Sequence, residues 1–568
     1  MRRKVSIIGT LVLGFCMLHA TVFAQGLEGV KNAIIAEQYQ SAMASLKKVL
    51  TLEKGDGAAY FYLGEIYLNL NQLDSAKAIF EKGSKVFPKN PLNFVGLGKG
   101  ALKAGQLKFA KDYFSTAVNL TNKKDFLPHL YISQAHLAID KPDLKAALAS
   151  LDKAAKVRKK TPTAEIYSGY GDYYSAQKKD ADALKSYQLA LNTNSEYTEA
   201  AVKMARIYTN TGEFLKADSI LKQITLQHPN YGAAYKALSS LYELWPDKDG
   251  AVSNNKVLAA NFYKNYLTIA GNYYGLLVKY AELCYRAGDF VNLANSLPIL
   301  NTFESSKNDL AVMRLNAYSA YENKDYNKAM HYLEACFAAI KDHTLITSED
   351  YLYFGRTQLK LRQEDKAIFN ILKAVEMDRT KSPFIAEIGQ FYYSRRNWVK
   401  AIEYYQQADI LPDAGNLTAA HAVYYATSIF FKHLQEKNTN SSKVMLLQAE
   451  RLLKAAITKA PDDVNAHLWY ARTLYLLEDP AARSWAMVGS YERYATLQEL
   501  SVYPQSAATR RSLVEAYNVI ASYASFKQDL NKASVYWNKA LSLDPQNSEA
   551  IAGIKSLNVR MRANYKIR

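Results

Sequence analysis

Apolar and small residues recur along this 568-residue chain with a period of 34 residues. In the stretch that begins at Tyr60 they stand at offsets +3, +4, +7, +16, +20 and +23, as Leu63, Gly64, Tyr67, Ala76, Phe80 and Gly83. In the stretch that begins 34 residues later, at Phe94, the same offsets hold Leu97, Gly98, Ala101, Ala110, Phe114 and Ala117. Residues three, four and seven positions apart share one face of an α-helix, so each period predicts two amphipathic helices joined by a turn.

This pattern covers almost the whole chain, from about residue 27 to about residue 546. It is cleanest in four ranges, 57–124, 164–231, 348–415 and 514–547. It is degraded at 274–310, where Ala281 and Cys284 keep the register but the second predicted helix lacks the small residue. A fixed period of this length is typical of a solenoid, in which each unit buries its apolar face only by stacking on its neighbours.

The pattern resembles the tetratricopeptide repeat, a helix–turn–helix unit. The resemblance implies an all-α fold, an α-solenoid of antiparallel helix pairs that form a right-handed superhelix. The small residues at offset +4 are expected where the two helices of a repeat cross closely, because a bulky side chain would hold them apart. Prolines follow several second helices, which a proline cannot continue, at Pro88, Pro229, Pro461 and Pro545.

Breaks in the period predict the division of the chain. Residues 244–256 lengthen one loop, residues 435–442 are polar and turn-like, and irregular segments flank a predicted long helix at 483–499. We predict five segments: a signal peptide at 1–24, an N-terminal array at 25–243, a middle array at 257–415, a C-terminal array at 416–546, and a capping helix with a basic tail at 547–568. The capping helix would turn Ile551, Ile554 and Leu557 toward the last repeat.

The amino terminus has the pattern of a secretory signal peptide. Arg2, Arg3 and Lys4 precede an apolar run over residues 5–18, and the sequence Val-Phe-Ala then predicts cleavage between Ala24 and Gln25. The apolar run is too short for a transmembrane helix, so we predict an exported protein of the periplasm or the outer membrane surface. A competing interpretation is a lipoprotein signal that ends at Cys16, which the bulky Phe15 disfavours. The cleavage site and the composition are typical of Bacteroidota.

The chain is basic, with a formal net charge of +18, of which +15 remains when residues 1–24 and their three positive charges are removed. Basic clusters at 123–124, 156–160 and 510–511 are either solvated helix ends or surfaces that attract an acidic partner. Cys284 and Cys336 fall on positions that face the core, where we expect buried thiols, although an exported protein also permits a disulfide.

No motif for catalysis, a cofactor or a metal stands out from the repeats. None of the nine histidines has a second histidine four residues away, which would place two ligands on one helix face. The glycines at 96, 98 and 100 lie inside a predicted helix and lack the preceding strand of a dinucleotide site. We therefore predict no enzyme activity, no cofactor, no metal and no nucleic-acid partner.

The concave surface of the predicted solenoid is the candidate binding site. Basic side chains fall on groove-lining positions of first helices, and three tyrosines fall between packing positions; these candidates are Lys99, Lys103, Arg206, Arg356, Lys360, Tyr318, Tyr321 and Tyr393. Some repeats of the resembled family hold a peptide's terminal carboxylate with Lys, Arg and Asn, and Asn69 and Asn210 stand at such positions. The complete set does not occur in any block of three repeats, so the general prediction is a basic and aromatic groove.

Three functions compete at this stage. The first is a non-enzymatic protein-interaction scaffold of the cell envelope, which binds a protein or peptide partner of acidic character in the groove. The second is a solenoid that binds glycan or peptidoglycan through groove tyrosines. The third is an enzyme whose site lies in a degraded region such as 274–310 or 416–510. The abundance of groove tyrosines and cations fits either of the first two functions.

Overall fold

The computed structural model describes residues 26–51, 56–158, 161–246, 254–410, 417–436, 440–479, 481–502 and 505–567. Helices and short connections make up these ranges, and no β-strand occurs in them. The chain forms two compact units, Met1–Asn323 and Lys324–Arg568. The predicted signal peptide and Cys16 lie outside the described residues. The predicted boundaries between arrays stay predictions.

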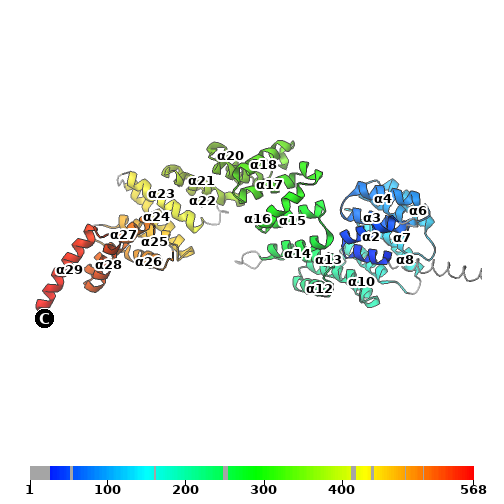
Figure 1. The fold of residues 1–568 in the computed structure, drawn as a ribbon, viewed down its shortest axis with the longest axis horizontal. Coiled ribbons are helices and arrows are strands. Elements are labelled where there is room, and N and C mark those ends of the chain that lie inside the picture. The colour runs from blue at the N-terminus through cyan, green and yellow to red at the C-terminus, as the bar shows by residue number, and fades with distance from the viewer. Residues whose placement is uncertain are drawn as a thin grey trace, which may run out of the picture. The chain divides into compact units, whose positions relative to one another are not determined.

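The first unit is built of consecutive helix pairs (Figure 1). It begins with a helical segment at 26–35. The helices that follow are α2 (Tyr39–Leu50), α3 (Gly57–Asn69), α4 (Leu73–Val86), α5 (Pro91–Lys103), α6 (Leu107–Leu120), α7 (Leu127–Leu137), α8 (Leu144–Val157), α9 (Ala164–Ala176), α10 (Asp180–Thr193), α11 (Thr198–Asn210), α12 (Phe214–Gln227), α13 (Gly232–Leu244), α14 (Asn254–Ala270), α15 (Tyr274–Arg286), α16 (Phe290–Leu300) and α17 (Leu310–Glu322).

The second unit continues in the same way. Its helices are α18 (Tyr326–Ala339), α19 (Ser348–Lys360), α20 (Glu364–Met377), α21 (Ile385–Ser394), α22 (Trp398–Ile410), α23 (Ala419–Gln435), α24 (Asn440–Lys459), α25 (Val464–Leu477), α26 (Val488–Glu499), α27 (Ala507–Phe526), α28 (Leu530–Leu543) and α29 (Ser548–Ile567). Short 3₁₀ helices at Glu304–Asn308, His343–Leu345 and Arg379–Phe384 complete the two units.

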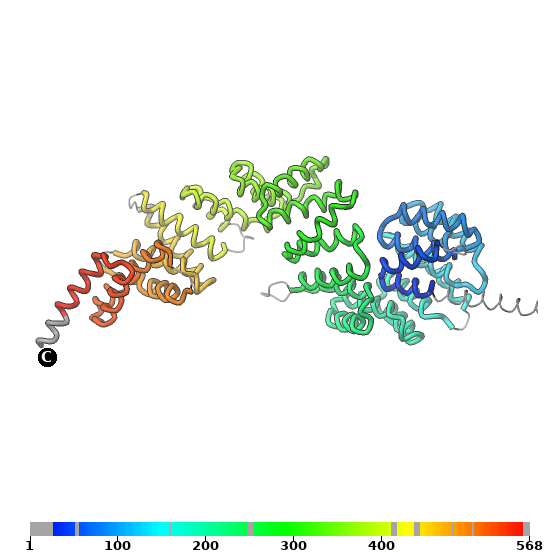
Figure 2. Tube along the Cα trace, in the orientation of Figure 1, coloured from blue at the N-terminus to red at the C-terminus, as the bar shows by residue number. Residues whose placement is uncertain are grey.

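Within each unit, each helix packs against the next one, and many first helices also pack against the first helix of the following pair. In the first unit α3 contacts both α4 and α5, and α5 contacts both α6 and α7. In the second unit α23 contacts α24 and α25, and α27 contacts α28 and α29. Figure 2 shows this stacking as successive hairpins along each unit. The all-α solenoid of antiparallel helix pairs is therefore confirmed.

The core positions are those of the 34-residue register. The small residue at offset +16 is fully buried in repeat after repeat, as Ala76, Ala110, Ala147, Ala183, Ala217, Ala329, Ala367, Ala401 and Ala533 show. The large residue at offset +20 lies against the glycine at offset +4. A Cβ atom built on Gly98 would stand 2.3 Å from Cε1 of Phe114, and one built on Gly171 would stand 2.3 Å from Cε1 of Tyr187. The two helices of a repeat therefore cross closely, as predicted, and at both of these crossings an aromatic ring of the second helix packs on the glycine of the first.

The turn inside a repeat has a further periodicity that the sequence pattern did not predict. Glu37, Asn71 and Gly105 follow one another at 34-residue intervals, and each has a positive φ angle, of 55°, 57° and 73°. This left-handed backbone ends the first helix and reverses the chain into the second. It is strained for residues other than glycine, so Glu37 and Asn71 depend on their surroundings to hold it.

Two predicted helices differ from the structure. The helix predicted at 483–499 begins only at Val488, because a loop joins α25 to α26 and holds Trp485 at a φ of 62°. In the carboxyl-terminal helix α29, Leu557 is buried and Ile554 packs against the core, but Ile551 is half exposed. Gly553 takes its place, because a Cβ there would lie 2.2 Å from the Trp537 ring.

Candidate functional site

The start of the first unit folds onto helices that lie some 130 to 230 residues later in the sequence. The backbone N–H of Ala233 donates to the carbonyl oxygen of Ala36 over 3.2 Å. The Gln38 side chain donates to the carbonyl of Asn230 over 2.7 Å, and the Tyr266 hydroxyl donates to the Glu37 carboxylate over 2.6 Å. These contacts join the first repeat to α13 and α14, so the repeats between them surround a central space.

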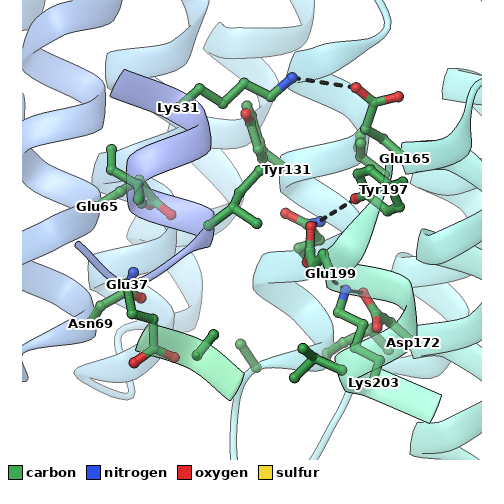
Figure 3. Close-up of a pocket in the computed structure, with 18 of the residues that line it drawn as sticks. Lys31, Glu37, Glu65, Asn69, Tyr131, Glu165, Asp172, Tyr197, Glu199 and Lys203 are labelled. Carbon is green, nitrogen blue, oxygen red and sulfur yellow. Dashed lines mark hydrogen bonds and ion pairs between the residues drawn. The ribbon is translucent and has the colours of Figure 1, made fainter. Parts of the chain in front are cut away.

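That space is a cavity of about 690 Å³. Its walls come from the segment 26–35 and from the first helices α3, α7, α9, α11 and α13. Aromatic side chains form much of the lining, namely Tyr39, Phe61, Tyr62, Tyr131, Tyr187, Tyr197 and Tyr231. Figure 3 shows charged side chains of opposite walls pointing toward one another. The cavity therefore lies among first helices, on which the groove-lining residues were predicted.

The charged lining residues are nearly balanced in sign. Five are carboxylates, Glu37, Glu65, Glu165, Asp172 and Glu199, and four are cations, Lys31, Lys203, Arg206 and Lys236. This corrects the expectation of a generally basic groove, at least for this cavity. The excess positive charge of the chain lies elsewhere, and the cavity presents paired charges among aromatic rings.

Most of these charges neutralise one another across the cavity walls. Lys31 on the first segment lies 3.3 Å from Glu165 on α9 (Figure 3). Lys236 on α13 lies 3.0 Å from Glu37. Burial tends to raise the pKa of Glu165, but hydrogen bonds from Thr163 and the backbone, together with Lys31, outweigh it and hold that pKa below its ordinary value. The ion pair of Lys31 with Glu165 therefore stabilises the fold at pH values above the ordinary pKa of a glutamate, and this stabilisation is lost as the pH falls.

Lys203 is the centre of the largest cluster. Its ammonium lies 2.9 Å from Asp172 and 2.7 Å from Glu199 (Figure 3). The Tyr187 hydroxyl donates to Asp172 and the Tyr197 hydroxyl donates to Glu199. Burial alone would lower the pKa of Lys203, but the two carboxylates outweigh it and raise that pKa. Burial likewise opposes ionisation of Glu199, yet Lys203 holds the pKa of Glu199 below its usual value.

Four polar groups of the lining are left available to a ligand. Arg206 on α11 is exposed, and of the four cations it alone forms no ion pair within the described part of the chain. Asn69 on α3 is also exposed, and its side chain forms a hydrogen bond with Tyr39. The Tyr231 hydroxyl and Oε1 of Glu65 are buried without a hydrogen-bond partner among the described residues. Buried polar atoms of this kind are normally satisfied by water or a ligand.

Of the eight predicted site residues, only Arg206 lines this cavity. Lys99 is half-buried in an ion pair with Glu65 at 2.5 Å, and Lys103 donates to the carbonyl of Leu68 over 3.3 Å. Tyr318 and Tyr321 are buried, with 4% and 5% of their surface exposed. That burial corrects their predicted placement on an open groove; the Tyr318 ring, for example, packs 5.3 Å from that of Tyr285.

The other predicted residues lie in the second unit. Arg356 pairs with Glu387 at 2.9 Å, and its guanidinium lies 4.8 Å from the Phe384 ring centroid. Tyr393 is half-buried between rings, 4.8 Å from Tyr424 and 5.6 Å from Trp398. Lys360 is exposed at the end of α19. Ion pairs and stacking therefore account for Arg356 and Tyr393 without a ligand.

Most of the charged lining residues were not predicted from the sequence, although their spacing carries a signal. Glu65 and Lys99 stand 34 residues apart, at the same position of successive repeats, and they form an ion pair. Asp172 and Lys203 are 31 residues apart, and Glu387 and Arg356 are also 31 apart. Opposite charges about one period apart on first helices therefore predict pairs between neighbouring repeats. No such rule predicts Lys31 with Glu165, which are 134 residues apart.

Comparison with known families supports the repeat assignment. A family profile described as tetratricopeptide repeat matches residues 33–92 and 174–242, and a second profile with the same description matches residues 514–547. The chain contains tetratricopeptide repeats. The matched ranges include three walls of the cavity, α3, α11 and α13.

Similar proteins of known name are distant. "Anaphase-promoting complex subunit 3" of Schizosaccharomyces pombe is 21% identical over 202 residues, which are 34% of this chain and 30% of that protein. The chain thus matches about a third of the length of this curated relative. Two solved structures with tetratricopeptide repeats are also similar. One is the carboxyl-terminal part of a protein from Cytophaga hutchinsonii, at 23% identity and a TM-score of 0.37, covering 49% of this chain and 98% of that one.

The other is a tetratricopeptide repeat protein from Parabacteroides merdae, with 20% identity and a TM-score of 0.29. It covers 45% of this chain and 94% of its own. In the described part of the chain, no helix has the combination of length and apolar character that a membrane crossing requires.

Proposed function

We propose that this protein is a non-enzymatic interaction scaffold and that the cavity of its first unit receives a polypeptide segment of a partner. The segment would present a carboxylate to Arg206. One observation carries this proposal: every other cation of the cavity lining is neutralised by a carboxylate, and Arg206 is exposed without one among the described residues. A guanidinium binds a carboxylate through two parallel hydrogen bonds, which gives both affinity and orientation.

The rest of the lining suits a polypeptide. Tyrosines supply a large apolar surface and a polar tip, and they lose little conformational freedom when a partner binds. The unpartnered Tyr231 hydroxyl and Oε1 of Glu65 can meet backbone amides and carbonyls of a bound segment. The repeats themselves favour this class of function, and the curated relative is by its name a subunit of a multiprotein complex.

We expect the Arg206→Glu variant to lose peptide binding. A charge-assisted hydrogen bond contributes about 1.5–3 kcal/mol, so the affinity should fall roughly tenfold or more. The test is a displayed library of random dodecapeptides selected on the purified protein, followed by affinity measurements at low and high salt. Selected peptides should carry Asp, Glu or a free carboxyl terminus, and their affinity should fall as salt screens the contact.

Lys111→Glu is the matched control, because Lys111 is an exposed lysine on the second helix α6, away from the cavity. Equal affinities for Arg206→Glu and the wild type would place the binding site elsewhere. The reversal of Lys99 or Arg356 would be a poor test, since each would then face a carboxylate partner of like charge. Binding to a peptidoglycan-fragment array, with no peptide selected, would instead support a glycan-binding solenoid.

The proposal includes export to the cell envelope. It rests on the basic start, the apolar run and the Val-Phe-Ala sequence that precede Gln25. We expect the protein recovered from the cells that make it to begin at Gln25. Amino-terminal sequencing decides this point: a chain that begins at Met1 would contradict export by this signal, and a lipid-modified Cys16 would replace it with a membrane anchor. The bacterial origin stays a prediction.

A further inference from the structure

A second cavity, of about 950 Å³, lies in the other unit, on the first-helix side of its last repeats. Its floor is α27, and its walls are the loop between α25 and α26, the end of α28 and the start of α29. The tetratricopeptide profile at 514–547 covers most of the floor. This cavity shares no residue with the cavity that contains Arg206, so the two cavities can bind different ligands.

Three arginines line this second cavity, Arg483, Arg510 and Arg511. All three are exposed, and within the described ranges none of them forms an ion pair. Three carboxylates also line the cavity, Glu515, Asp544 and Glu549. Glu515 is occupied by Arg472 at 2.6 Å and by the Tyr491 hydroxyl at 2.5 Å, and Asp544 accepts hydrogen bonds from the Gln546 backbone and the Asn547 side chain. Arg510 Nε donates to the carbonyl oxygen of Gln505 over 3.4 Å, and the remaining N–H groups of the three arginines are available to an anion from solution.

The position of two of these arginines does not favour helix α27 in the free protein. Arg510 and Arg511 lie near the amino-terminal end of α27, which begins at Ala507. The amino terminus of a helix carries partial positive charge, so cations there are unfavourable. Local helix stability does not explain two adjacent arginines at this place, whereas a bound anion would be attracted by both the guanidinium groups and the helix.

A buried acceptor in the same cavity points to a second feature of the ligand. Asn518 is only 4% exposed, and its amide donates to Oδ1 of Asn547 over 2.9 Å. Oδ1 of Asn518 has no hydrogen-bond partner in the described structure. Because an unsatisfied buried acceptor is costly, the ligand should bring a donor such as a hydroxyl group to this atom.

Aromatic rings supply the third feature. Trp485 and Tyr475 line the cavity, and Tyr475 is 47% exposed. The Arg483 guanidinium lies 5.6 Å from the Trp485 ring centroid and 6.0 Å from that of Tyr475. Trp485 is held in a left-handed conformation, with its backbone N–H donated to the Glu478 carboxylate. Strained backbone that presents an aromatic ring to a cavity is typical of a binding site.

We propose that this second cavity binds an acidic saccharide, a sugar that carries a sulfate, phosphate or carboxylate group. Its anionic group would lie between Arg510, Arg511 and Arg483, and a ring hydroxyl would donate to Oδ1 of Asn518. The flat apolar face of the sugar ring would lie against Trp485 or Tyr475. An acidic side chain of a peptide offers the anion but lacks the flat face, and so meets fewer of these groups.

The test is calorimetric titration of the purified full chain with four probes. These are a heparin-derived hexasaccharide, neutral maltohexaose, sodium sulfate and a hexaglutamate peptide. We expect the hexasaccharide to bind at least tenfold more tightly than the other three. The Arg510→Ala, Arg511→Ala double variant should weaken that binding at least tenfold, and Trp485→Ala should weaken it several-fold.

The control variant is Arg451→Ala with Lys454→Ala, which removes the same charge from exposed positions of α24 in the same unit. It should change the hexasaccharide affinity less than twofold; a loss equal to that of the double arginine variant would overturn the site, because the attraction would then be non-specific. Equal binding of hexaglutamate would overturn the saccharide assignment, and equal binding of sulfate would reduce the site to one for a simple anion.

Two further variants test the role of Asn518 and separate binding in this cavity from binding in the first cavity. Asn518→Leu keeps the branched shape of the side chain but removes both the acceptor and the amide that donates to Asn547. We expect weaker hexasaccharide binding, and the thermal midpoint of the variant measures the accompanying loss of stability separately. Unchanged affinity in this variant would exclude Asn518 from the site and overturn the proposed orientation. Arg206→Glu should leave hexasaccharide binding intact. The saccharide result is therefore independent of whether the first cavity binds a peptide.

Discussion

Replacement of Gly98 by leucine is expected to lower the free energy of unfolding by about 1–3 kcal/mol or more, as overpacking of a tight core does. Gly98 lies where α5 crosses α6, and a Cβ atom there would stand 2.3 Å from Cε1 of the Phe114 ring. Phe114 is itself buried against neighbouring repeats, so it has little room to move. Urea denaturation followed by circular dichroism should therefore show a lower midpoint.

Gly100 provides a matched control in the same helix. A Cβ atom on Gly100 would meet nothing within 4 Å, so Gly100→Leu should not overpack. It should instead stabilise α5 by roughly 0.5–1 kcal/mol, because glycine is a poor helix residue. Equal midpoints for the two variants would show that the assigned register is wrong. Combining Gly98→Leu with Phe114→Ala should cost less than the sum of the two single changes, since the deleted ring makes room for the leucine.

Removal of the Lys203 ammonium should have the largest electrostatic effect on stability. In Lys203→Met the carboxylates of Asp172 and Glu199 would remain in the cavity wall without the cation that lies within 3 Å of both. Breaking a buried ion pair costs about 3–5 kcal/mol, and partial solvent access to this cluster lowers our expectation to roughly 2–4 kcal/mol at neutral pH. Lys185→Met, on the exposed side of α10, is the control and should change stability by less than about 0.5 kcal/mol.

The cost of this substitution should decrease as the pH falls. In the wild type the pKa of Glu199 is held below its ordinary value, so this group stabilises the fold above its unfolded pKa and loses that contribution on acidification. In the wild type burial already raises the pKa of Asp172 above its ordinary value in spite of Lys203. Without Lys203, burial and mutual repulsion should raise that pKa further and should also raise the pKa of Glu199 above its unfolded value. The variant is then destabilised at neutral pH and relieved by protonation. Denaturation between about pH 7 and about pH 4 should show the two proteins converging, and a constant difference would contradict the assignment.

The sequence by itself determined the repeats, their register and most residues of their core, although Tyr318 and Tyr321 were assigned to a groove and are buried. Ala110 and Phe114 were placed on the second helix of a repeat, and Gly98 on the crossing point, from spacing alone. This succeeds because the helix period and the contact between the two helices of a repeat are local, within 34 residues of chain. The ion pair of Lys99 with Glu65 belongs to the same class, since comparison of equivalent positions in neighbouring repeats would have revealed it.

Only the tertiary structure decided which groove residues come together and which remain available. The first cavity exists because residues 31–38 meet α9, α13 and α14, a closure set by the accumulated rotation of many repeats rather than by any local spacing. That closure neutralised Lys31 and left Arg206 exposed. Charge and position on a helix are written in the sequence, but the distance between residues on remote repeats depends on small rotations summed over the whole array, and those rotations come from packing.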